Sequence, residues 1–541
     1  MTTSGCSGIR SAQWAAVADR REPFDVIVIG GGATGLGVAV DAAARGFAVA
    51  LFEAEDFAKG TSSRATKLVH GGVRYLAQGN LGLVREALRE RALLLANADH
   101  LVAPLPFILP TYGWRGRLWD RWFYGAGLLV YGLLAGRAAL GRTGLPGRRR
   151  LLASAPGLEP VGLAGGVSYV DGQFDDARLA VALARTAADR GAVMLNYCRV
   201  VGLAEAGAGR HRLHGVEVED REIGRRFTVA ARCVVNATGV WVDAVRRLDD
   251  PAAADMVAPS QGVHVVVDRE FFPSDRAMII PRTSDGRVLF AVPWLGRVIL
   301  GTTDTPRPDL PLEPRPFAAE VDFILTEAAR YLVRHPSRGD VRSAWAGLRP
   351  LVKPSGGDVR DTKRISREHT IEVSAHGLVT VTGGKWTTYR AMAEDVLAAC
   401  FRTGLLPERP GGITRHLRLV GADGSPGQRV PLSAPPGLHL YGSEAKTVAG
   451  LPGAGHEILP GLTEAMVRFA VRSEFARTVE DVLARRSRWL FLDAAAAADA
   501  AGAVAAIVGE ERSDESGASF DTGASAAAFA SLAKGYLLVP R

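Results

Sequence analysis

The sequence contains few cysteines and few lysines. The four cysteines, Cys6, Cys198, Cys233 and Cys400, form no CxxC pair and show no histidine-rich spacing, which argues against a disulfide framework, a zinc site or an iron–sulfur cluster. We therefore expect no metal, and any redox chemistry must use a bound organic cofactor. Only seven of the 65 basic residues are lysines. The net charge of +8 thus reflects an arginine-rich composition and gives little support to nucleic-acid binding, which needs a clustered basic patch.

Long apolar runs are also scarce. The first 24 residues hold none that would serve as a signal peptide, and from this we expect an intracellular protein. The segment 117–142 has an apolar core at 122–135, flanked by aromatic and arginine residues, and this core is too short to span a bilayer. Two interpretations stay open for it: a helix that lies at a membrane interface, or a buried core helix.

The chain does contain ample apolar material and a glycine-rich turn. Its 541 residues, of which 47% are hydrophobic, predict two or three domains. Residues 25–30 predict a buried parallel strand, and the alanine-rich stretch 35–46 predicts the helix that follows it. The turn 30–35 fits GxGxxG, and a second strand ends on Glu53. This order is typical of a dinucleotide site, in which glycines admit a pyrophosphate and a carboxylate binds a ribose. A turn used only for helix packing is the alternative.

Two further strand-to-turn segments favour FAD over NAD as the ligand. Residues 233–239 (CVVNATG) form an apolar strand that ends in a turn of small residues. Residues 378–384 (LVTVTGG) repeat this pattern, and an amphipathic helix follows them. Three separate approaches to one ligand suit FAD, which is a long, extended molecule. No second GxGxxG with a matching context is present, so we expect electrons to enter from the substrate itself.

Seven motifs follow one another between residue 25 and about residue 508. They are GGGATGLGVAVDAAARG at 30–46, TSSRATKLVHGGVRYL at 61–76, PSQGVHVVV at 259–267, LGTTDT at 300–305, WAGLRPL at 345–351, TGGKWTTYR at 382–390 and VRFAVRSEFARTVEDVLARRSRWLFLD at 467–493. Together they resemble the aerobic, quinone-linked FAD-dependent glycerol-3-phosphate dehydrogenases, within the D-amino-acid-oxidase-like flavoenzymes. All seven in order make this resemblance specific.

The resemblance implies an α/β fold with three parts. An FAD-binding Rossmann-like (D-amino-acid-oxidase-like) domain is interleaved with an antiparallel-sheet substrate domain, and a C-terminal helical domain follows. Within an oxidoreductase region at 24–400, we expect FAD-binding segments at about 24–105, 181–259 and 341–400 and substrate-domain segments at about 106–180 and 260–340. Short strands broken by Gly, Asp and Pro turns support the antiparallel sheet. Residues 405–541 are expected to form the helical domain, in which the polar tail segment 513–526 is mobile.

The predicted FAD contacts come from the three turns and from the stretch 61–76. Ser62 and Ser63 offer hydroxyls, and Lys67 offers a cation, to the flavin phosphates. Gly71 and Gly72 allow a flat ring to approach the backbone. The full set is Gly30, Gly31, Gly32, Ala33, Thr34, Gly35, Glu53, Ser62, Ser63, Lys67, Gly71, Gly72, Thr238, Gly239, Thr382, Gly383, Gly384, Lys385 and Thr387. The alternative for the stretch 61–76 is an ordinary strand and loop with solvated charges.

The resemblance also implies a reaction, the oxidation of sn-glycerol 3-phosphate to dihydroxyacetone phosphate by hydride transfer to the flavin. His264 stands in a valine-rich strand and is the candidate base, because an imidazole titrates near neutral pH and burial can tune it. A histidine that only fills the core is the alternative. Lys385 follows two glycines at a helix start, where it can contact both flavin and substrate. Which of His264 and Lys385 accepts the proton stays open.

Four further residues are predicted to hold the substrate. Arg349 and Arg74 are candidates for the phosphate, because a guanidinium binds two oxygens at once; Arg349 is also counted as catalytic. For Arg74 a structural ion pair is the alternative. The resemblance implies that Tyr75 faces the substrate as well. Thr303, next to Asp304, is expected to orient the substrate, with a local turn as the alternative.

The resemblance further implies noncovalent FAD, a membrane quinone as electron acceptor, an anionic lipid surface as partner and no nucleic acid, and it allows a homodimer. It places the protein in the cytoplasm, peripherally attached to the cytoplasmic face of the inner membrane. Two other functions stay open. One is a glycerol-3-phosphate oxidase that uses oxygen and releases hydrogen peroxide, disfavoured because no large insertion is obvious. The other is a flavin-binding protein without turnover.

Overall fold

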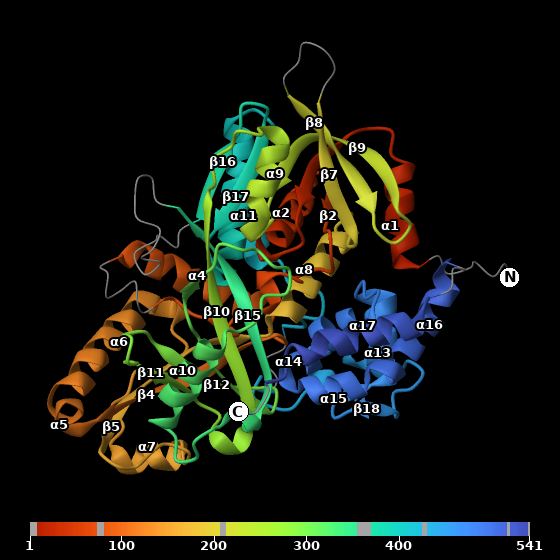
Figure 1. Ribbon diagram of the computed structural model, residues 1–541. Helices are drawn as coiled ribbons and strands as arrows, with labels where there is room; N and C mark the ends of the chain where they lie inside the picture. Colours follow the sequence, from red (N-terminus) through yellow and green to blue (C-terminus); the bar gives the residue numbers. More distant parts are fainter. Residues whose placement is uncertain are drawn as a thin grey trace.

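The structure is a computed structural model that describes residues 8–72, 80–205, 212–353, 369–424, 430–516 and 520–538. Two predicted substrate contacts, Arg74 and Tyr75, lie outside the described residues. Figure 1 shows the chain as two sheet-containing parts joined by the long strand pair β10 and β15, with the C-terminal helices packed beside them.

The first sheet carries the glycine-rich turn. Its strand order is β16-β17-β9-β1-β2-β6, and the β7–β8 hairpin extends it from β9. The strands are β1 (Phe24–Ile29), β2 (Val49–Phe52), β6 (Val193–Leu195), β7 (Cys198–Glu205), β8 (Leu213–Asp220), β9 (Arg225–Asn236), β16 (His369–Val373) and β17 (Leu378–Gly383). The pairs β6–β2, β2–β1, β1–β9 and β9–β17 are parallel. This confirms the buried parallel strand predicted at 25–30, since strands covered on both faces read as continuous apolar runs, and the strands predicted before the other two turns are also parallel.

Helices cover this sheet. The helix α2 (Ala33–Ala44) follows the glycine turn and packs against α8 (Asp176–Asp189) and α11 (Tyr389–Arg402). Their apolar faces and the central strands form one continuous core. The remaining helices of the two sheet-containing parts are α1 (Ile9–Ala18), α4 (Leu81–Asn97), α5 (Gly113–Arg115), α6 (Arg121–Ala135), α7 (Arg148–Ser154), α9 (Val242–Asp249) and α10 (Ala318–Ala329).

The second sheet is largely antiparallel. Its order is β14-β10-β13-β12-β11-β4-β5-β3, and β15 pairs with β10 on the outside of that path. The strands are β3 (Leu68–Val69), β4 (Val102–Tyr112), β5 (Leu163–Phe174), β10 (Val257–Asp268), β11 (Ala277–Ile280), β12 (Leu289–Trp294), β13 (Arg297–Gly301), β14 (Thr305–Pro306) and β15 (Val341–Val352). One pair, β11–β4, is parallel. The short strands expected between residues 260 and 340 are therefore present.

The strand β15 corrects one expected boundary. Residues 341–352 were assigned to the flavin-binding part, but they pair with β10 along nearly its whole length and belong to the second sheet. This sheet also begins earlier than expected, at Val102, and takes in β3. The reason is that a strand's sheet depends on distant hydrogen-bond partners, which a local pattern does not specify.

The C-terminal part is helical, as expected. It contains α12 (Ala445–Ala449), α13 (Glu464–Ser473), α14 (Trp489–Leu492), α15 (Ala494–Asp499), α16 (Ala501–Ser516) and α17 (Thr522–Lys534), with a short hairpin of β18 (Glu457–Leu459) and β19 (Leu462–Thr463). Of the segment 513–526, expected to be mobile, residues 517–519 lie outside the described residues. Residues 513–516 end α16 and residues 522–526 begin α17, where the Asp521 side chain accepts a hydrogen bond from Ala524 N at 2.8 Å. Such a cap stabilises a helix start despite the small, polar composition.

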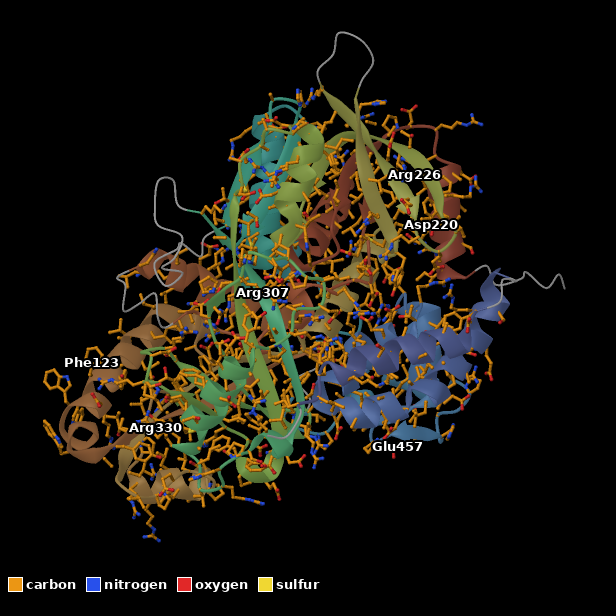
Figure 2. All side chains as sticks on the ribbon, viewed as in Figure 1. Phe123, Asp220, Arg226, Arg307, Arg330 and Glu457 are labelled. Atoms are coloured by element: carbon orange, nitrogen blue, oxygen red, sulfur yellow. The ribbon has the colours of Figure 1, made fainter. Side chains whose placement is uncertain are left out.

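The segment around α6 has two faces of different character. Gly125, Leu128 and Tyr131 are buried, whereas Trp122 and Phe123 are each 62% exposed and Leu133 is 72% exposed. Figure 2 shows the Phe123 ring pointing away from the body of the protein. One face of α6 is therefore part of the core, as one interpretation expected, whereas contact of the exposed face with a membrane stays a prediction. Within the described parts of the chain, no helix combines the length and apolarity needed to cross a membrane.

Candidate active site

A cavity of about 1870 Å³ lies between the two sheets. One wall comes from the first sheet and contains the three predicted turns, around Gly30, Thr238 and Gly383. The other wall comes from the second sheet and contains His264 and Arg349. Motifs that stand far apart in the sequence thus meet in one space.

The glycine-rich turn at the end of β1 has no room for side chains. Gly30 has φ +108°, and a Cβ atom there would lie 2.8 Å from Ala237 O. A Cβ atom on Gly35 would lie 1.9 Å from Gly30 O, so the turn requires glycine at this position. The Ser62 hydroxyl lies at the start of α2 and accepts a hydrogen bond from Ala33 N at 2.9 Å. The turn therefore presents backbone and a hydroxyl where a dinucleotide phosphate binds.

Glu53 lies beside this turn at the end of β2. Its carboxylate accepts hydrogen bonds from Gly31 N at 2.6 Å and from Glu55 N at 2.9 Å. Burial raises the pKa of Glu53 to about 6, although these two hydrogen bonds work in the opposite direction. Glu53 lines the cavity. Its spacing from the glycine turn along the sequence is that of the carboxylate that binds a ribose in dinucleotide sites.

The second and third turns lie next to each other. The Thr382 hydroxyl donates to Gly239 O at 3.2 Å and links them. Gly383 and Gly384 have φ values of +82° and +72°, which favour glycine over residues with a side chain. Lys385 and Thr387 follow and line the cavity. All three turns line one cavity, as a ligand that contacts each of them requires.

Thirteen of the predicted FAD contacts line the cavity. They are Gly30, Gly32, Ala33, Thr34, Glu53, Ser62, Gly72, Thr238, Gly239, Gly383, Gly384, Lys385 and Thr387. The six other predicted contacts are not among the cavity-lining residues and contact other parts of the protein. Gly31 N donates to Glu53, and Ser63 O accepts from two buried cations. A Cβ atom on Gly71 would lie 2.6 Å from Tyr131 Oη, so this glycine permits packing against protein. The roles of Gly35 and Thr382 are those described for the turns.

Lys67 corrects a prediction, because its side chain does not reach the cavity. Its ammonium is fully buried and pairs with Asp176 at 2.7 Å. It also donates to Ser63 O at 2.9 Å. Burial lowers the pKa of Lys67 to about 8, and Asp176 works in the opposite direction. The sequence places this lysine in a stretch expected to bind the flavin phosphates. In the folded protein its ammonium points into the interior and pairs with Asp176 instead.

His264 lies in β10 and faces the cavity. Its Nε2 atom lies 2.9 Å from the Thr66 hydroxyl, and its ring stacks on Trp345 with 5.4 Å between centroids. Burial lowers the pKa of His264 well below its usual value, and the charges of Lys67 and Arg349 add to this effect. The imidazole is therefore neutral at physiological pH and has the protonation state of a base.

Arg349 lies in β15, opposite Ser260 of β10, and lines the same cavity wall as His264. Its guanidinium pairs with Asp304 at 2.9 Å and donates to Thr303 O at 3.1 Å. The Thr303 hydroxyl donates to Glu320 at 2.9 Å and accepts from Val263 N at 3.0 Å. Thr303 thus helps to hold the loop that fixes Arg349.

Thr66, His70 and Thr302 are among the cavity-lining residues that were not predicted from the sequence. Thr66 and His70 belong to the stretch 61–76, which had been singled out, but their types gave no reason to choose them over their neighbours. Thr302 Oγ1 accepts a hydrogen bond from Arg349 Nη2 at 3.3 Å. Only contacts across the fold distinguish these residues.

The fold and the cavity define the class of the protein as an FAD-dependent oxidoreductase. Residues 25–390 match the family described as FAD dependent oxidoreductase, and residues 412–515 match the C-terminal domain of alpha-glycerophosphate oxidase. The mitochondrial glycerol-3-phosphate dehydrogenase of Homo sapiens is 41% identical over 536 residues, which cover 93% of this chain and 72% of the relative. The corresponding protein of Arabidopsis thaliana is 40% identical and covers 93% of this chain and 85% of its own length.

A solved structure agrees with these relatives. The glycerol-3-phosphate dehydrogenase from Bacillus halodurans, complexed with FAD, superposes with a TM-score of 0.77 at 29% identity, and 98% of each chain is covered. The chain belongs to the family of FAD-dependent glycerol-3-phosphate dehydrogenases. The family resemblance, the fold class and the FAD cofactor expected from the sequence are thereby confirmed.

Proposed function

We propose that this protein oxidises sn-glycerol 3-phosphate to dihydroxyacetone phosphate and passes the electrons to a membrane quinone. The observation that carries the proposal is the position of His264 and Arg349 on the wall opposite the three dinucleotide-binding turns. A substrate between these walls has a base and a cation on one side. FAD, when bound along the turns, supplies the acceptor for the hydride.

The substrate phosphate is assigned to Arg349. Its guanidinium is fixed by Asp304 and by Thr303 O, so it loses little freedom when an anion binds. Asp304 neutralises part of its charge, and a dianionic substrate needs a further cation. Lys385 lines the cavity from the third turn and supplies one.

The proton of the substrate hydroxyl is assigned to His264. The neutral imidazole accepts it, while the contact with Thr66 fixes the orientation of the ring. Two electrons and the hydrogen on carbon leave together as hydride, and the hydroxyl proton leaves separately to the base. Lys385 is the second candidate for this proton, because it too lines the cavity.

A quinone suits the apolar extension of the cavity. Phe123, Leu128 and Val130 of α6 line this end, and exposed aromatic side chains of the same helix adjoin it. Such a surface, with arginines at its margin, is typical of a protein that rests on an anionic membrane. We therefore place the acceptor and the membrane at the α6 side of the molecule.

The function is tested with purified holoenzyme under anaerobic conditions. Addition of sn-glycerol 3-phosphate should bleach the visible flavin absorption, and a soluble quinone should restore it faster than air does. Recovery mainly by air, with formation of hydrogen peroxide, would instead support an oxidase. A flavin that stays oxidised would contradict the proposed substrate and leave a flavin-binding protein without this turnover.

A further inference from the structure

The C-terminal helical part reaches the back of the active site through Arg488. This residue directly precedes α14 and is fully buried. Its Nη2 atom donates to Ser63 O at 2.8 Å and to the Asp176 carboxylate at 3.0 Å. Its Nη1 atom donates to Ala484 O within the C-terminal part at 2.9 Å. One guanidinium thus joins the C-terminal part, the loop after β2 and the start of α8.

Lys67 contacts the same two groups as Arg488, the Ser63 carbonyl and the Asp176 carboxylate. Its ammonium donates to the same Ser63 O and to Asp176, whose carboxylate also accepts from Ala65 N at 2.9 Å. Asp175 lies 3.5 Å from Arg488 and adds a second negative charge. Two buried cations therefore face two buried carboxylates, which keeps the desolvated charges balanced.

The backbone at both cations is unusual. Lys67 has φ +64° and Arg488 has φ +69°, in the left-handed region that favours glycine. Residues with long side chains persist there only when their surroundings hold them in place. Here the surroundings are the shared contacts with Ser63 and Asp176 and an apolar enclosure.

The enclosure is aromatic and touches the histidine site. The Lys67 ammonium lies 5.3 Å from the ring centroid of Trp294, 5.4 Å from that of Trp345 and 5.6 Å from that of Phe491. Trp345 is the ring on which His264 stacks. Phe491 belongs to α14 and packs edge-on against Trp345, with 5.0 Å between ring centroids. The C-terminal part therefore supplies the layer directly behind the proposed base.

The loop held by this network carries two residues of the active site. The Ser62 hydroxyl accepts a hydrogen bond from Ala33 N at the start of α2, beside the glycine turn, and Thr66 contacts His264. Ser63, whose carbonyl receives both cations, stands between them. A shift of this loop would displace the phosphate-side hydroxyl and the partner of the base together.

We propose that Arg488 is a positioning residue for flavin reduction, which acts from the C-terminal part through Ser63, Asp176 and Lys67 on the loop that carries Ser62 and Thr66. The inference rests on the proposed function for its kinetic consequence, while its consequence for FAD binding stands apart from any substrate. It assigns to the C-terminal part a role in the geometry of the active site.

The test compares Arg488→Met and Arg488→Lys with the wild-type holoenzyme. Two quantities are measured: the rate constant of anaerobic flavin reduction by sn-glycerol 3-phosphate, and the dissociation constant of FAD from its fluorescence. We expect Arg488→Met to lower the rate and raise the dissociation constant, each by roughly tenfold to a hundredfold, as displacement of reacting groups by about 1 Å does. Arg488→Lys keeps the charge but not the forked contacts, so it should recover part of each loss.

Arg477→Met is the matched control. Arg477 is also a buried arginine of the C-terminal part, and its guanidinium pairs with Glu222 at 2.9 Å, remote from the loop. This variant should lower thermal stability without changing reduction or FAD binding. Arg488→Met and Arg477→Met could instead have equal effects on the reduction rate constant, on the dissociation constant of FAD and on thermal stability. This result would show that Arg488 has only a structural role and would overturn the inference.

Lys67→Met tests the network from its other end and serves if Arg488→Met does not fold. It should loosen FAD, as Arg488→Met does. It should also move the acidic limb of the pH profile of the reduction rate to higher pH. The charges of Lys67 and Arg349 both lower the pKa of His264, and Arg349 is itself paired with Asp304. Removing the Lys67 charge therefore raises this pKa. Arg488→Lys should leave this limb in place. Unchanged FAD binding in both Lys67→Met and Arg488→Lys would contradict the inference.

The failure of the proposed function is distinguishable from the failure of this inference. If sn-glycerol 3-phosphate does not reduce the flavin of the wild-type protein, only the proposed function is contradicted, because the FAD-binding measurements still decide the role of Arg488.

Discussion

The imidazole of His264 and the hydroxyl of Thr66 lie 2.9 Å apart, although 198 positions separate them in the sequence. The contact joins a strand of the second sheet to the loop that also holds the phosphate-side hydroxyl of Ser62. It makes the orientation of the proposed base depend on the loop that is proposed to contact the cofactor.

Thr66→Val should therefore slow flavin reduction without changing the fold. The substitution keeps the side-chain shape but removes a contact worth about 1 kcal/mol, so the reduction rate constant should fall by roughly threefold to tenfold. Stopped-flow absorption under anaerobic conditions measures it. Thr403→Val is the control, because that hydroxyl donates only to carbonyl groups of α11, Ala399 O and Cys400 O, away from the cavity. An unchanged rate in Thr66→Val would show that the ring needs no such partner.

His264→Asn should lower the reduction rate constant by roughly a hundredfold to ten-thousandfold, the usual contribution of a general base. The substrate concentration that gives half the maximal reduction rate should change little. A rate close to that of the wild type would assign the proton to Lys385 instead.

The pKa of His264 also predicts a pH dependence of stability. Because burial lowers its pKa in the folded protein, the unfolded chain binds a proton below about pH 6.5 when the folded chain does not. The free energy of unfolding should therefore decrease as the pH falls below that value, and His264→Asn should weaken this decrease. Urea unfolding at several pH values measures it.

Arg349→Met should weaken substrate binding and leave bound FAD in place. Loss of a charge-assisted contact should raise the substrate requirement by roughly tenfold to a hundredfold. Arg342→Met is the matched control, because Arg342 lies in the same strand and pairs with Asp268 at 2.6 Å outside the cavity. Identical steady-state kinetics in the two variants would remove Arg349 from the phosphate site.

Glu53 should make FAD affinity depend on pH. Its pKa is raised to about 6 by burial, so the carboxylate proposed to accept from the ribose becomes protonated as the pH falls below that value. FAD should bind more weakly below about pH 6, as measured by fluorescence titration. Glu53→Gln should bind FAD weakly at all pH values and show a flatter profile. A wild-type profile in Glu53→Gln would contradict the ribose contact.

Phe123→Asp combined with Leu133→Asp should reduce binding to vesicles of anionic lipid. Both side chains belong to the exposed face of α6, at 62% and 72% exposure, and charged residues there disfavour contact with the headgroup region. Val161→Asp is the control, since Val161 is an apolar residue of 78% exposure outside α6. Cosedimentation with vesicles distinguishes the variants. Equal binding of all three proteins would place the membrane contact elsewhere.

Several parts of this protein follow from local sequence. The apolar strand, the turn at 30–35 and Glu53 follow one another along the chain, and their contacts span few positions. The glycines at 30, 35 and 383 were predictable because backbone conformation and close packing exclude a side chain there. The three turns were recognised as approaches to one ligand because each of them follows an apolar strand.

Other features depended on contacts between distant segments. Lys67 has the chemistry of a phosphate ligand, yet Asp176, Arg488 and three aromatic rings direct it into the interior. The strand β15 joins the second sheet because β10 pairs with it along its length. In both cases the outcome depends on partners at least 74 positions away, and residue type alone does not choose those partners.

The sequence by itself determined the family and the cofactor class, because these reside in short motifs whose residues act together locally. The tertiary structure alone decided which cation faces the cavity, which threonine orients His264 and how the C-terminal helices reach the active site. These depend on burial and on hydrogen bonds between segments that meet only when the chain is folded.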